Sequence, residues 1–380
     1  MGDKNEQERQ KNSRERVMRV QFNAVLKDVT RKGTKIQTDE YLTEGKFPII
    51  DQGNNDIAGY RDDETGLFTD VPAIVFGDHT RIVKYITEPF FLGADGVKVL
   101  VPNDRTMNCK YLYYQLLSAK IPDTGYNRHF KWVKELEFQL PSRNEQDDVV
   151  KRLDKLCVVI SARQQQLAKL DELVKARFVE MFGDPVLNPY GFEKVPLSEL
   201  AEIKIGPFGS LLHKEDYIEG GHPLLNPSHI VDGNIVPDKK LTISDEKYNE
   251  LEAYHLHFGD VVMGRRGEMG RCAVVMGEGF LCGTGSLLIR TRGEVTADFI
   301  QKVISFPSFK KTIEDMAVGQ TMPNLNVPIV SRFQVVKPPV KVQHRYYSFI
   351  GEVDNLRQQV QKSIEKLKTL KGALMQQYFG

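Results

Sequence analysis

Two long stretches of this chain place apolar residues at alternating steps of three and four, the spacing of an amphipathic helix with one apolar stripe. The first stripe comprises Leu153, Leu156, Ile160, Leu167, Leu170 and Val174, and the second comprises Ile350, Val353, Val360, Ile364, Leu367 and Leu374. Gly183 and Pro185 are a typical helix stop after the first stripe. We therefore expect long helices over residues 142–183 and 338–380, each about 60 Å long at about 1.5 Å per residue.

The two helical stretches are copies of each other, and the chain before each of them is also duplicated. At a shift of 197, Met181-Phe182-Gly183 matches Tyr378-Phe379-Gly380, Gln146 matches Gln343 and Pro141 matches Pro338. Upstream the shift is smaller: 175 between residues 47–50 and 222–225, 187 between 74–77 and 261–264, and 189 between Phe91 and Phe280. A shift that grows in steps indicates one fold with longer loops in the second copy.

Residues 1–141 and 184–337 are interpreted as two compact α/β domains, so the predicted fold class is mixed α+β. Buried strands are expected at 71–76 and 260–263, and short helices at 111–119 and 299–306.

The two long helices are expected to pair within the chain. Antiparallel packing would turn the duplication into a pseudo-twofold axis, with a domain at each end of a rod. Arg357 and Lys371 interrupt the second stripe, and Asp171 and Glu365 are acidic partners available across such an interface. The alternative is a homodimeric coiled coil between two chains. The presence of two copies in one chain favours the intramolecular pair.

Composition adds limits rather than a function. The chain has 380 residues, 41% hydrophobic and 27% charged, which is typical of soluble proteins. About the first 15 residues form a charged arm without the apolar core of a signal peptide. Four cysteines without CxxC spacing disfavour zinc and indicate a reducing cytoplasm. A net charge of +1 means that a nucleic-acid-binding protein of this kind must gather its cations on one face.

Two pairs of polar loops lie at equivalent points of the two copies and are candidates for DNA contact. Arg can form hydrogen bonds with guanine, and Asn or Gln can form them with adenine. Lys and Thr can bind phosphates. In the first copy the candidates are Asp78, His79, Thr80, Arg81, Asn127, Arg128, His129 and Lys131. In the second copy they are Arg265, Arg266, Arg271, Gln320, Asn324 and Asn326, with Ser210 and Lys214 as weaker ones. Solvated surface turns, or turns that dock a domain on its helix, are the alternatives.

No set of residues with the spacing of a catalytic, metal or nucleotide site stands out. Asn188-Pro189-Tyr190 resembles part of an adenine methyltransferase motif, but no cofactor-binding glycine motif precedes it. The leading hypothesis is a non-enzymatic DNA-reading subunit. A stand-alone adenine methyltransferase with its own recognition domain, and a coiled-coil scaffold without a DNA role, are the alternatives.

The repeated domain-and-helix unit, with Phe182-Gly183-Asp184-Pro185 between the copies, resembles the specificity subunit of type I restriction–modification enzymes. Phe76-Gly77-Asp78-His79-Thr80-Arg81 and Thr321-Met322-Pro323-Asn324-Leu325-Asn326 are also similar to that family. The resemblance covers nearly the whole chain after the charged arm.

This resemblance implies a subunit that neither cuts nor methylates. Each target-recognition domain would read one half of a bipartite, asymmetric DNA site, and the helices would fix the unread spacer. The partners would be double-stranded DNA, two methyltransferase subunits that use S-adenosylmethionine, and two restriction subunits that use ATP and Mg. The chain itself would bind no cofactor.

Overall fold

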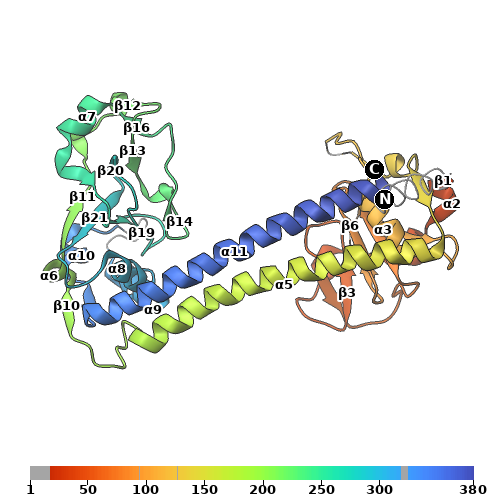
Figure 1. Ribbon diagram of the computed structural model, residues 1–380, viewed down its shortest axis with the longest axis horizontal. Helices are drawn as coiled ribbons and strands as arrows, with labels where there is room; N and C mark the ends of the chain where they lie inside the picture. The colour runs from red at the N-terminus through yellow and green to blue at the C-terminus, as the bar shows by residue number, and fades with distance from the viewer. Residues whose placement is uncertain (1–17, 94, 126, 318–323) are drawn as a thin grey trace, which may run out of the picture. The chain divides into compact units, whose positions relative to one another are not determined.

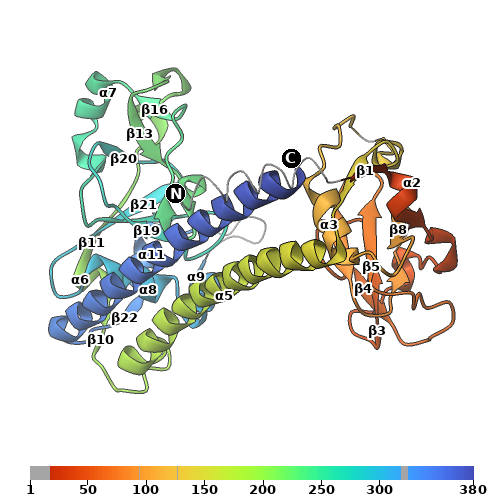
Figure 2. The ribbon, with the colours of Figure 1, turned by 45° about the vertical axis from the view of Figure 1, so that its right-hand side comes forward.

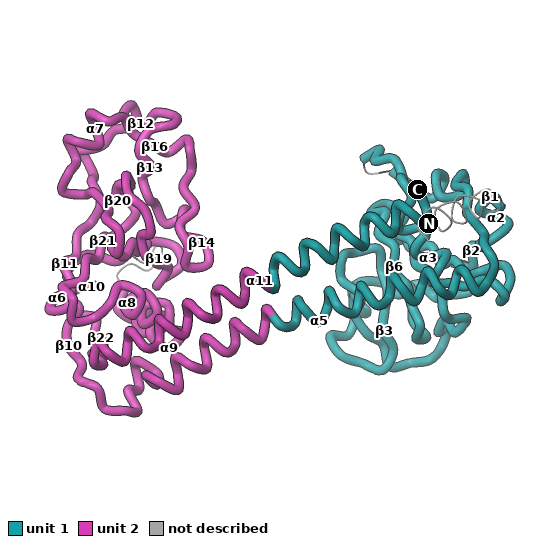
Figure 3. The backbone as a smooth tube through the Cα atoms, viewed as in Figure 1, with its two compact units in different colours: residues 1–166, 360–380 teal, residues 167–359 magenta. Residues whose placement is uncertain are grey.

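The computed structural model describes residues 18–93, 95–125, 127–317 and 324–380 (Figure 1). The chain divides into two compact units, residues 1–166 with 360–380 and residues 167–359 (Figure 3). Each unit contains one mixed α/β domain, the first half of the long helix that follows this domain, and the last half of the other long helix. The predicted mixed fold class is confirmed.

The first unit is built on two small sheets that share a core with short helices. One sheet has the order β2(Leu26–Asp28), β8(Val97–Pro102), β5(Ala73–Gly77), β6(Val83–Ile86), and the other has the order β4(Gly59–Arg61), β3(Phe47–Ile50), β7(Phe91–Leu92). A further pair joins β1(Met18–Gln21) to β9(Glu137–Leu140), and the helices of the domain are α2(Phe22–Val25), α3(Cys109–Ser118) and α4(Phe130–Val133). Strand β5 is fully buried and lies at the position predicted for a buried strand.

The second unit repeats this plan with additions. Its four-stranded sheet has the order β11(Ala201–Ile205), β21(Ser286–Thr291), β18(Val261–Gly264), β19(Cys272–Val274). Its five-stranded sheet has the order β12(Tyr217–Ile218), β16(Thr242–Ile243), β13(His222–Leu225), β20(Phe280–Cys282), β17(His255–Leu256). The strand pairs are β10(Lys194–Pro196) with β22(Gln334–Val336) and β14(Ile230–Val231) with β15(Asn234–Ile235). The helices are α6(Leu197–Leu200), α7(Asp245–Glu250), α8(Ala297–Ile304), α9(Pro307–Met316) and α10(Val327–Ser331).

The strand connections confirm the internal duplication. In each unit a strand and a single helical turn lead into a four-stranded antiparallel sheet, and the second sheet contains a parallel strand pair, β3 with β7 or β13 with β20. The register corrects one of the sequence matches. Ile49 pairs with Phe91, and its counterpart Leu224 pairs with Leu281, so Phe91 is equivalent to Leu281 rather than to Phe280. The similar aromatic residues at 91 and 280 obscured this shift of one position.

The two long helices are α5(Arg143–Phe182) and α11(Val340–Phe379), each of 40 residues. They lie side by side in both views (Figures 1 and 2). In the first unit Arg152 near the start of α5 donates a hydrogen bond to Tyr378 near the end of α11, at 3.3 Å. In the second unit Arg357 bonds Asp171, one of the two acidic residues that the sequence offered as partners. These contacts confirm an antiparallel pair within one chain.

The twelve stripe residues are all buried or half-buried. Arg357 and Asp171 add a charged contact at a point where the second stripe lacks an apolar residue. The assignment of each stripe residue to the helix–helix interface stays a prediction, which this burial supports.

A buried glutamine docks each domain on the helix that follows it. Gln146, which is 3% exposed, accepts a hydrogen bond from the backbone N–H of Asn108 at 2.8 Å and donates to the carbonyl of Pro141 at 2.9 Å. Gln343, which is 0% exposed, accepts from the N–H of Thr296 at 2.9 Å and donates to the carbonyl of Pro338 at 2.8 Å. Asn108 and Thr296 are the N-cap residues of α3 and α8, so the two contacts are equivalent.

The end of the other long helix holds the same domain helix from another side. In the first unit the ring of Phe379 packs on Tyr111 of α3, with centroids 5.3 Å apart. In the second unit Phe182 packs on Phe299 of α8, with centroids 5.0 Å apart. Each domain is therefore fixed both to the start of one long helix and to the end of the other.

Candidate nucleic-acid interface

In each domain the two candidate loops come together, although about fifty or more residues separate them in the chain. The backbone N–H of His129 donates to the carbonyl of Asp78 at 2.7 Å, and that of Leu325 donates to the carbonyl of Arg265 at 3.0 Å. Asp78 and Arg265 each follow the glycine that ends a buried strand, β5 or β18. The same backbone contact thus joins the loop after this strand to the loop before the long helix in both copies.

A third loop joins the same place in each unit. The N–H of Asp78 donates to the carbonyl of Gly96 at 2.7 Å, and the N–H of Arg265 donates to the carbonyl of Gly285 at 3.0 Å. Both glycines immediately precede the central strand of the sheet, β8 or β21. Three loops therefore meet at one edge of each domain, and sequence matching had identified two of them.

Two of the candidates in the first unit are buried. Asp78 is 3% exposed, and its carboxylate accepts a hydrogen bond from the N–H of Phe130 at 2.7 Å. His129 is 0% exposed, and its ring Nδ1 lies 3.0 Å from the carbonyl of Asp78. Both side chains hold the two loops together, and neither presents an atom to solvent for a base.

The next three candidates are half-buried or exposed but bonded within the protein. The N–H of His79 donates to Oε1 of Gln52 at 3.1 Å, and the hydroxyl of Thr80 donates to the carbonyl of the same Gln52 at 2.7 Å. Arg81 adopts φ 61°, which is unfavourable for a residue with a Cβ, and forms an ion pair with Asp123 at 2.6 Å. Gln52 is a residue that sequence reasoning missed, because it belongs to no matched loop.

Arg81 is held by its carboxylate partner, Asp123. The N–H of Gly125 and then the Arg81 guanidinium lower the pKa of Asp123 below its ordinary value of 3.8, so this carboxylate is ionised at neutral pH. Arg81 is therefore neutralised locally and serves to hold residues 121–123 beside the strand-end loop.

Three candidates of the first unit project into solvent. Asn127 and Arg128 are exposed on the loop before α4, Lys131 is exposed in the turn of α4, and Nδ2 of Asn127 donates to the carbonyl of Thr124 at 2.5 Å. Lys131 lies over the ring of Trp132, with Nζ 5.0 Å from the centroid. This short segment provides two cations and an amide at the edge where the three loops meet.

In the second unit the loop between β18 and β19 carries three arginines with different surroundings. Arg265 donates from Nε to the carbonyl of Leu325 at 3.0 Å, and burial lowers the pKa of its guanidinium below the ordinary value. Arg266 is exposed at the loop tip. Arg265 therefore connects two loops, whereas Arg266 is presented to solvent.

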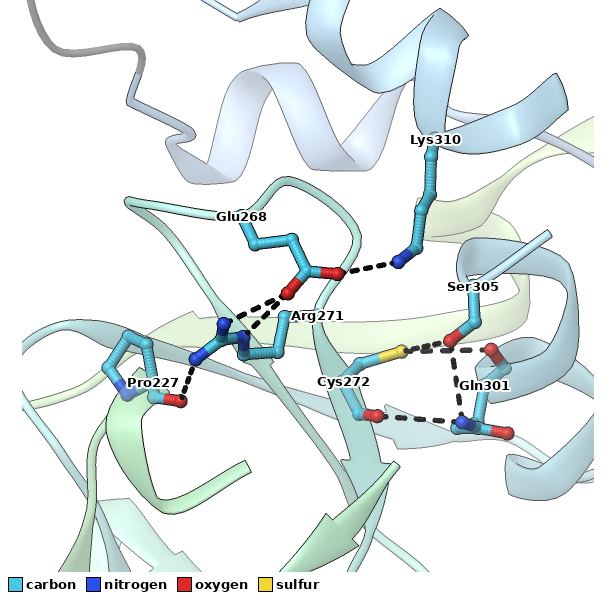
Figure 4. Close-up of polar contacts among 7 residues, drawn as sticks. All are labelled: Pro227, Glu268, Arg271, Cys272, Gln301, Ser305 and Lys310. Atoms are coloured by element: carbon cyan, nitrogen blue, oxygen red, sulfur yellow. Dashed lines mark hydrogen bonds and ion pairs between the residues drawn. The ribbon is translucent and has the colours of Figure 1, made fainter. Parts of the chain in front are cut away.

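Arg271 is held by an acidic residue of its own loop (Figure 4). Its Nη2 lies 2.9 Å from Glu268, and Lys310 of α9 contacts the other oxygen of the same carboxylate at 2.8 Å. The hydrogen bond from Lys310, followed by that from Arg271, lowers the pKa of Glu268 from the ordinary 4.5. Neither Glu268 nor Lys310 was a candidate, because the sequence did not show that α9 lies beside this loop.

The remaining candidates differ in position. Asn326 is the N-cap of α10 and accepts from the N–H of Ile329 at 3.0 Å. Asn324 is half-buried, and Gln320 lies outside the described residues. Ser210 and Lys214 are exposed on the short helical turns after β11.

Within the described residues, no group of three or more His, Cys, Asp or Glu side chains could hold a metal ion. No helix there combines the length and the apolar character that crossing a bilayer requires. The site presents cations, amides and backbone groups, which are suited to binding rather than to bond-making chemistry.

Comparison with known proteins identifies the family. A curated relative is the MjaVIII type I restriction enzyme specificity subunit of Methanocaldococcus jannaschii, which is 20% identical over 313 residues, 75% of this chain and 74% of that protein. The fold resembles that of a type I restriction–modification S subunit from M. genitalium, with a TM-score of 0.52 and 17% identity, over 96% of this chain and 97% of that one.

A second solved structure has the same fold. It comes from work on complex assembly and conformational transition of the type I R-M system, and it matches with a TM-score of 0.64 and 15% identity over 95% of this chain and 97% of that one. The family model for the type I restriction modification DNA specificity domain matches twice, at residues 23–172 and 189–368. The chain therefore belongs to this family and is the DNA specificity subunit, a non-catalytic component, of a type I restriction–modification system.

Proposed function

We propose that residues 1–141 and 184–337 are two target-recognition domains, and that each reads one half of a bipartite, asymmetric DNA site. The observation that carries this proposal is the meeting of three equivalent loops at one edge of each domain. The scaffold of the edge is repeated, whereas its exposed side chains differ: Asn127, Arg128 and Lys131 in one copy and Arg266 in the other. A repeated frame with different contacts is suited to reading two different half-sites.

The proposal ranks the predicted contact residues by their surroundings. Arg128, Lys131 and Arg266 are the leading DNA contacts, because they are exposed cations beside the joined loops. Asp78 and His129 support these loops from within, and Arg81 and Arg265 connect neighbouring loops.

The long helices, residues 142–183 and 338–380, are proposed to set the spacer between the half-sites and to dock two methyltransferase subunits. Exposed apolar residues support the docking role. Val159 and Leu356 are 42% and 48% exposed, and Leu173 and Leu370 are 46% and 48% exposed. Each pair is related by the shift of 197 that relates the helices, so the same outward positions are apolar in both copies.

These apolar residues also gather in pairs within each unit. The Arg357–Asp171 bond places Leu173 and Leu356 at nearly the same level of the antiparallel helices in the second unit. The Arg152–Tyr378 bond does the same for Val159 and Leu370 in the first unit. Two equivalent patches suit two copies of one partner.

The catalytic cofactors would be held by the partners: S-adenosylmethionine by the methyltransferases, and ATP with Mg by any restriction subunits. DNA in the cytoplasm would be the substrate of such a complex, and a cytoplasmic location is part of the proposal.

Domain exchange tests the reading role. Residues 1–141 are replaced by the corresponding domain of another family member, and the methylated sequence is mapped in cells that also express the methyltransferase. We expect one half of the site to change and the other to persist. A change in both halves, or in neither, would refute independent reading.

Insertion of one heptad near Leu167 tests the spacer role. The expected result is a longer unread spacer between unchanged half-sites. An altered half-site would contradict the role of the helices as a spacer.

Paired substitutions test the docking role. Leu173→Ser with Leu356→Ser should leave one methyltransferase per chain instead of two in mass measurement of the purified complex, and Val159→Ser with Leu370→Ser should do the same. Leu187→Ser changes an exposed leucine outside the helices and is the matched control. Retention of two methyltransferases in both double variants would refute docking at these patches.

A further inference from the structure

A surface cluster of opposite charges lies at the loop between β18 and β19 of the second unit (Figure 4). One oxygen of the Glu268 carboxylate lies 2.9 Å from Nη2 and 3.2 Å from Nε of Arg271. The other oxygen lies 2.8 Å from Nζ of Lys310 on α9. Two cations from separate elements thus converge on the two oxygens of one anion.

The cations are held in place by contacts other than Glu268. Nη1 of Arg271 donates to the carbonyl of Pro227 at 3.3 Å. The stem of Lys310 packs against Gly270, where an added Cβ would lie only 2.8 Å from its Cγ. Removal of the carboxylate would therefore leave the guanidinium and the ammonium group close to their present positions.

The carboxylate, in contrast, is on a segment that can move. Glu268 is 54% exposed and directly follows Gly267, which has φ 80° and no neighbour within 4 Å of an added Cβ. Met269 on its other side is 4% exposed and anchors the loop in the core. Rotation of the Glu268 side chain can release both cations without detaching the loop.

The surroundings favour an anion from outside the protein. Arg265 and Arg266 begin the same loop, so the loop carries three arginines and one carboxylate, and Lys310 of α9 adds a fourth cation beside that carboxylate. Exposed ion pairs are individually weak, so an incoming anion can replace the carboxylate. A phosphodiester offers two non-bridging oxygens, which fit a guanidinium fork and an ammonium group as the carboxylate oxygens do.

We propose that Arg271 and Lys310 form a seat for a phosphate of the DNA backbone, and that Glu268 occupies this seat in the protein without DNA. The inference rests on the proposed DNA-reading function and adds a regulatory element to it. DNA must displace an internal competitor at a contact that carries no sequence information. The competitor lowers affinity for all DNA and leaves the choice between sequences to the base contacts.

The test measures binding of a labelled duplex of mixed sequence to the complex of this chain with its methyltransferase, over a series of salt concentrations. Glu268→Gln removes the competitor and keeps the shape of the side chain. Glu294→Gln is the matched control, because Glu294 is 57% exposed, pairs with Lys337 at 2.8 Å and gives the same change of charge in the same unit. Lys310→Met removes one cation of the seat, and Lys310→Arg retains it.

We expect Glu268→Gln to bind the duplex about fivefold more tightly than Glu294→Gln, equivalent to about 1 kcal/mol. The slope of log affinity against log salt should be unchanged in Glu268→Gln. In Lys310→Met the slope should fall by roughly 0.9, the value for one lost phosphate contact, and Lys310→Arg should restore it.

Two results would overturn the seat: equal affinity of Glu268→Gln and Glu294→Gln, or a wild-type slope in Lys310→Met. If Lys310→Met fails to fold, the Glu268→Gln comparison decides alone. Failure of the DNA-reading function has a different signature, because the wild-type complex would then bind without salt dependence and without preference for its methylated site.

Discussion

Replacement of Gln343 by Leu should loosen the second domain from its helix while the side-chain volume is nearly retained. Gln343 is fully buried, and its amide bonds the N–H of Thr296 at 2.9 Å and the carbonyls of Pro338 and Glu294 at 2.8 and 3.4 Å. A buried backbone group without a partner costs about 1–3 kcal/mol. Loss of the two shorter bonds should therefore cost about 2–4 kcal/mol in the local stability of the α8–α11 contact.

The assay is amide hydrogen exchange, because a chain with two units does not give one global free energy of unfolding. A loss of 2 kcal/mol corresponds to roughly 30-fold faster exchange of amides that open with this contact. We expect this acceleration at Thr296 and the first turn of α8, with no change at α3. Gln146→Leu should accelerate exchange in the first turn of α3 and leave α8 unchanged. Gln358→Leu, at an exposed position of α11, is the control. The reasoning is refuted if exchange at Thr296 in Gln343→Leu matches that in Gln358→Leu.

Three further substitutions have defined outcomes. Asp260→Ala should destabilise the second unit by about 3 kcal/mol in amide hydrogen exchange of its strands, because Asp260 is 3% exposed and bonds Arg290 through both oxygens; a loss below about 1 kcal/mol would contradict this. Gly270→Ala should cost about 2 kcal/mol in the same assay, because φ is 75° and the added Cβ would lie 2.9 Å from a helix carbonyl; unchanged stability would contradict this. Because the folded-state pKa of Glu268 is lowered, its stabilising effect is present above the ordinary value of 4.5 and is lost as pH falls through the folded value. The melting temperature of wild type should therefore exceed that of Glu268→Gln at neutral pH and converge with it in acid, and a constant difference would contradict this.

The long helices could be predicted to within two residues because their apolar stripes and the glycine stop are local features of the sequence. The expected ranges 142–183 and 338–380 compare with observed helices at 143–182 and 340–379. The sequence offered Asp171 and Glu365 as acidic partners for the basic residues that interrupt the second stripe. Asp171 pairs with Arg357, and this choice depends on the register of the two helices, which the sequence did not define.

The candidate site was predicted less completely. The equivalence of the loops in the two copies identified the segments that meet. It could not show which side chains of these loops are buried, as Asp78 is, and which are exposed, as Arg128 is. Burial depends on contacts such as that between Asp78 and Phe130, which joins residues 52 positions apart. The pairing of Glu268 with Lys310 depends in the same way on the packing of α9, which no local pattern reveals.

The docking glutamines have a consequence for how such a protein can change over generations. Gln146 bonds the backbone N–H of Asn108 and the carbonyl of Pro141, and Gln343 bonds the equivalent groups of Thr296 and Pro338. None of these four bonds uses a side chain of the domain. A domain that keeps an aromatic ring at the position of Tyr111 or Phe299 can therefore replace its other side chains, or be exchanged whole by recombination, and still present the backbone groups that the glutamine binds. The attachment tolerates new sequences, so a new DNA preference can arise without a new way of joining it to the rest of the enzyme.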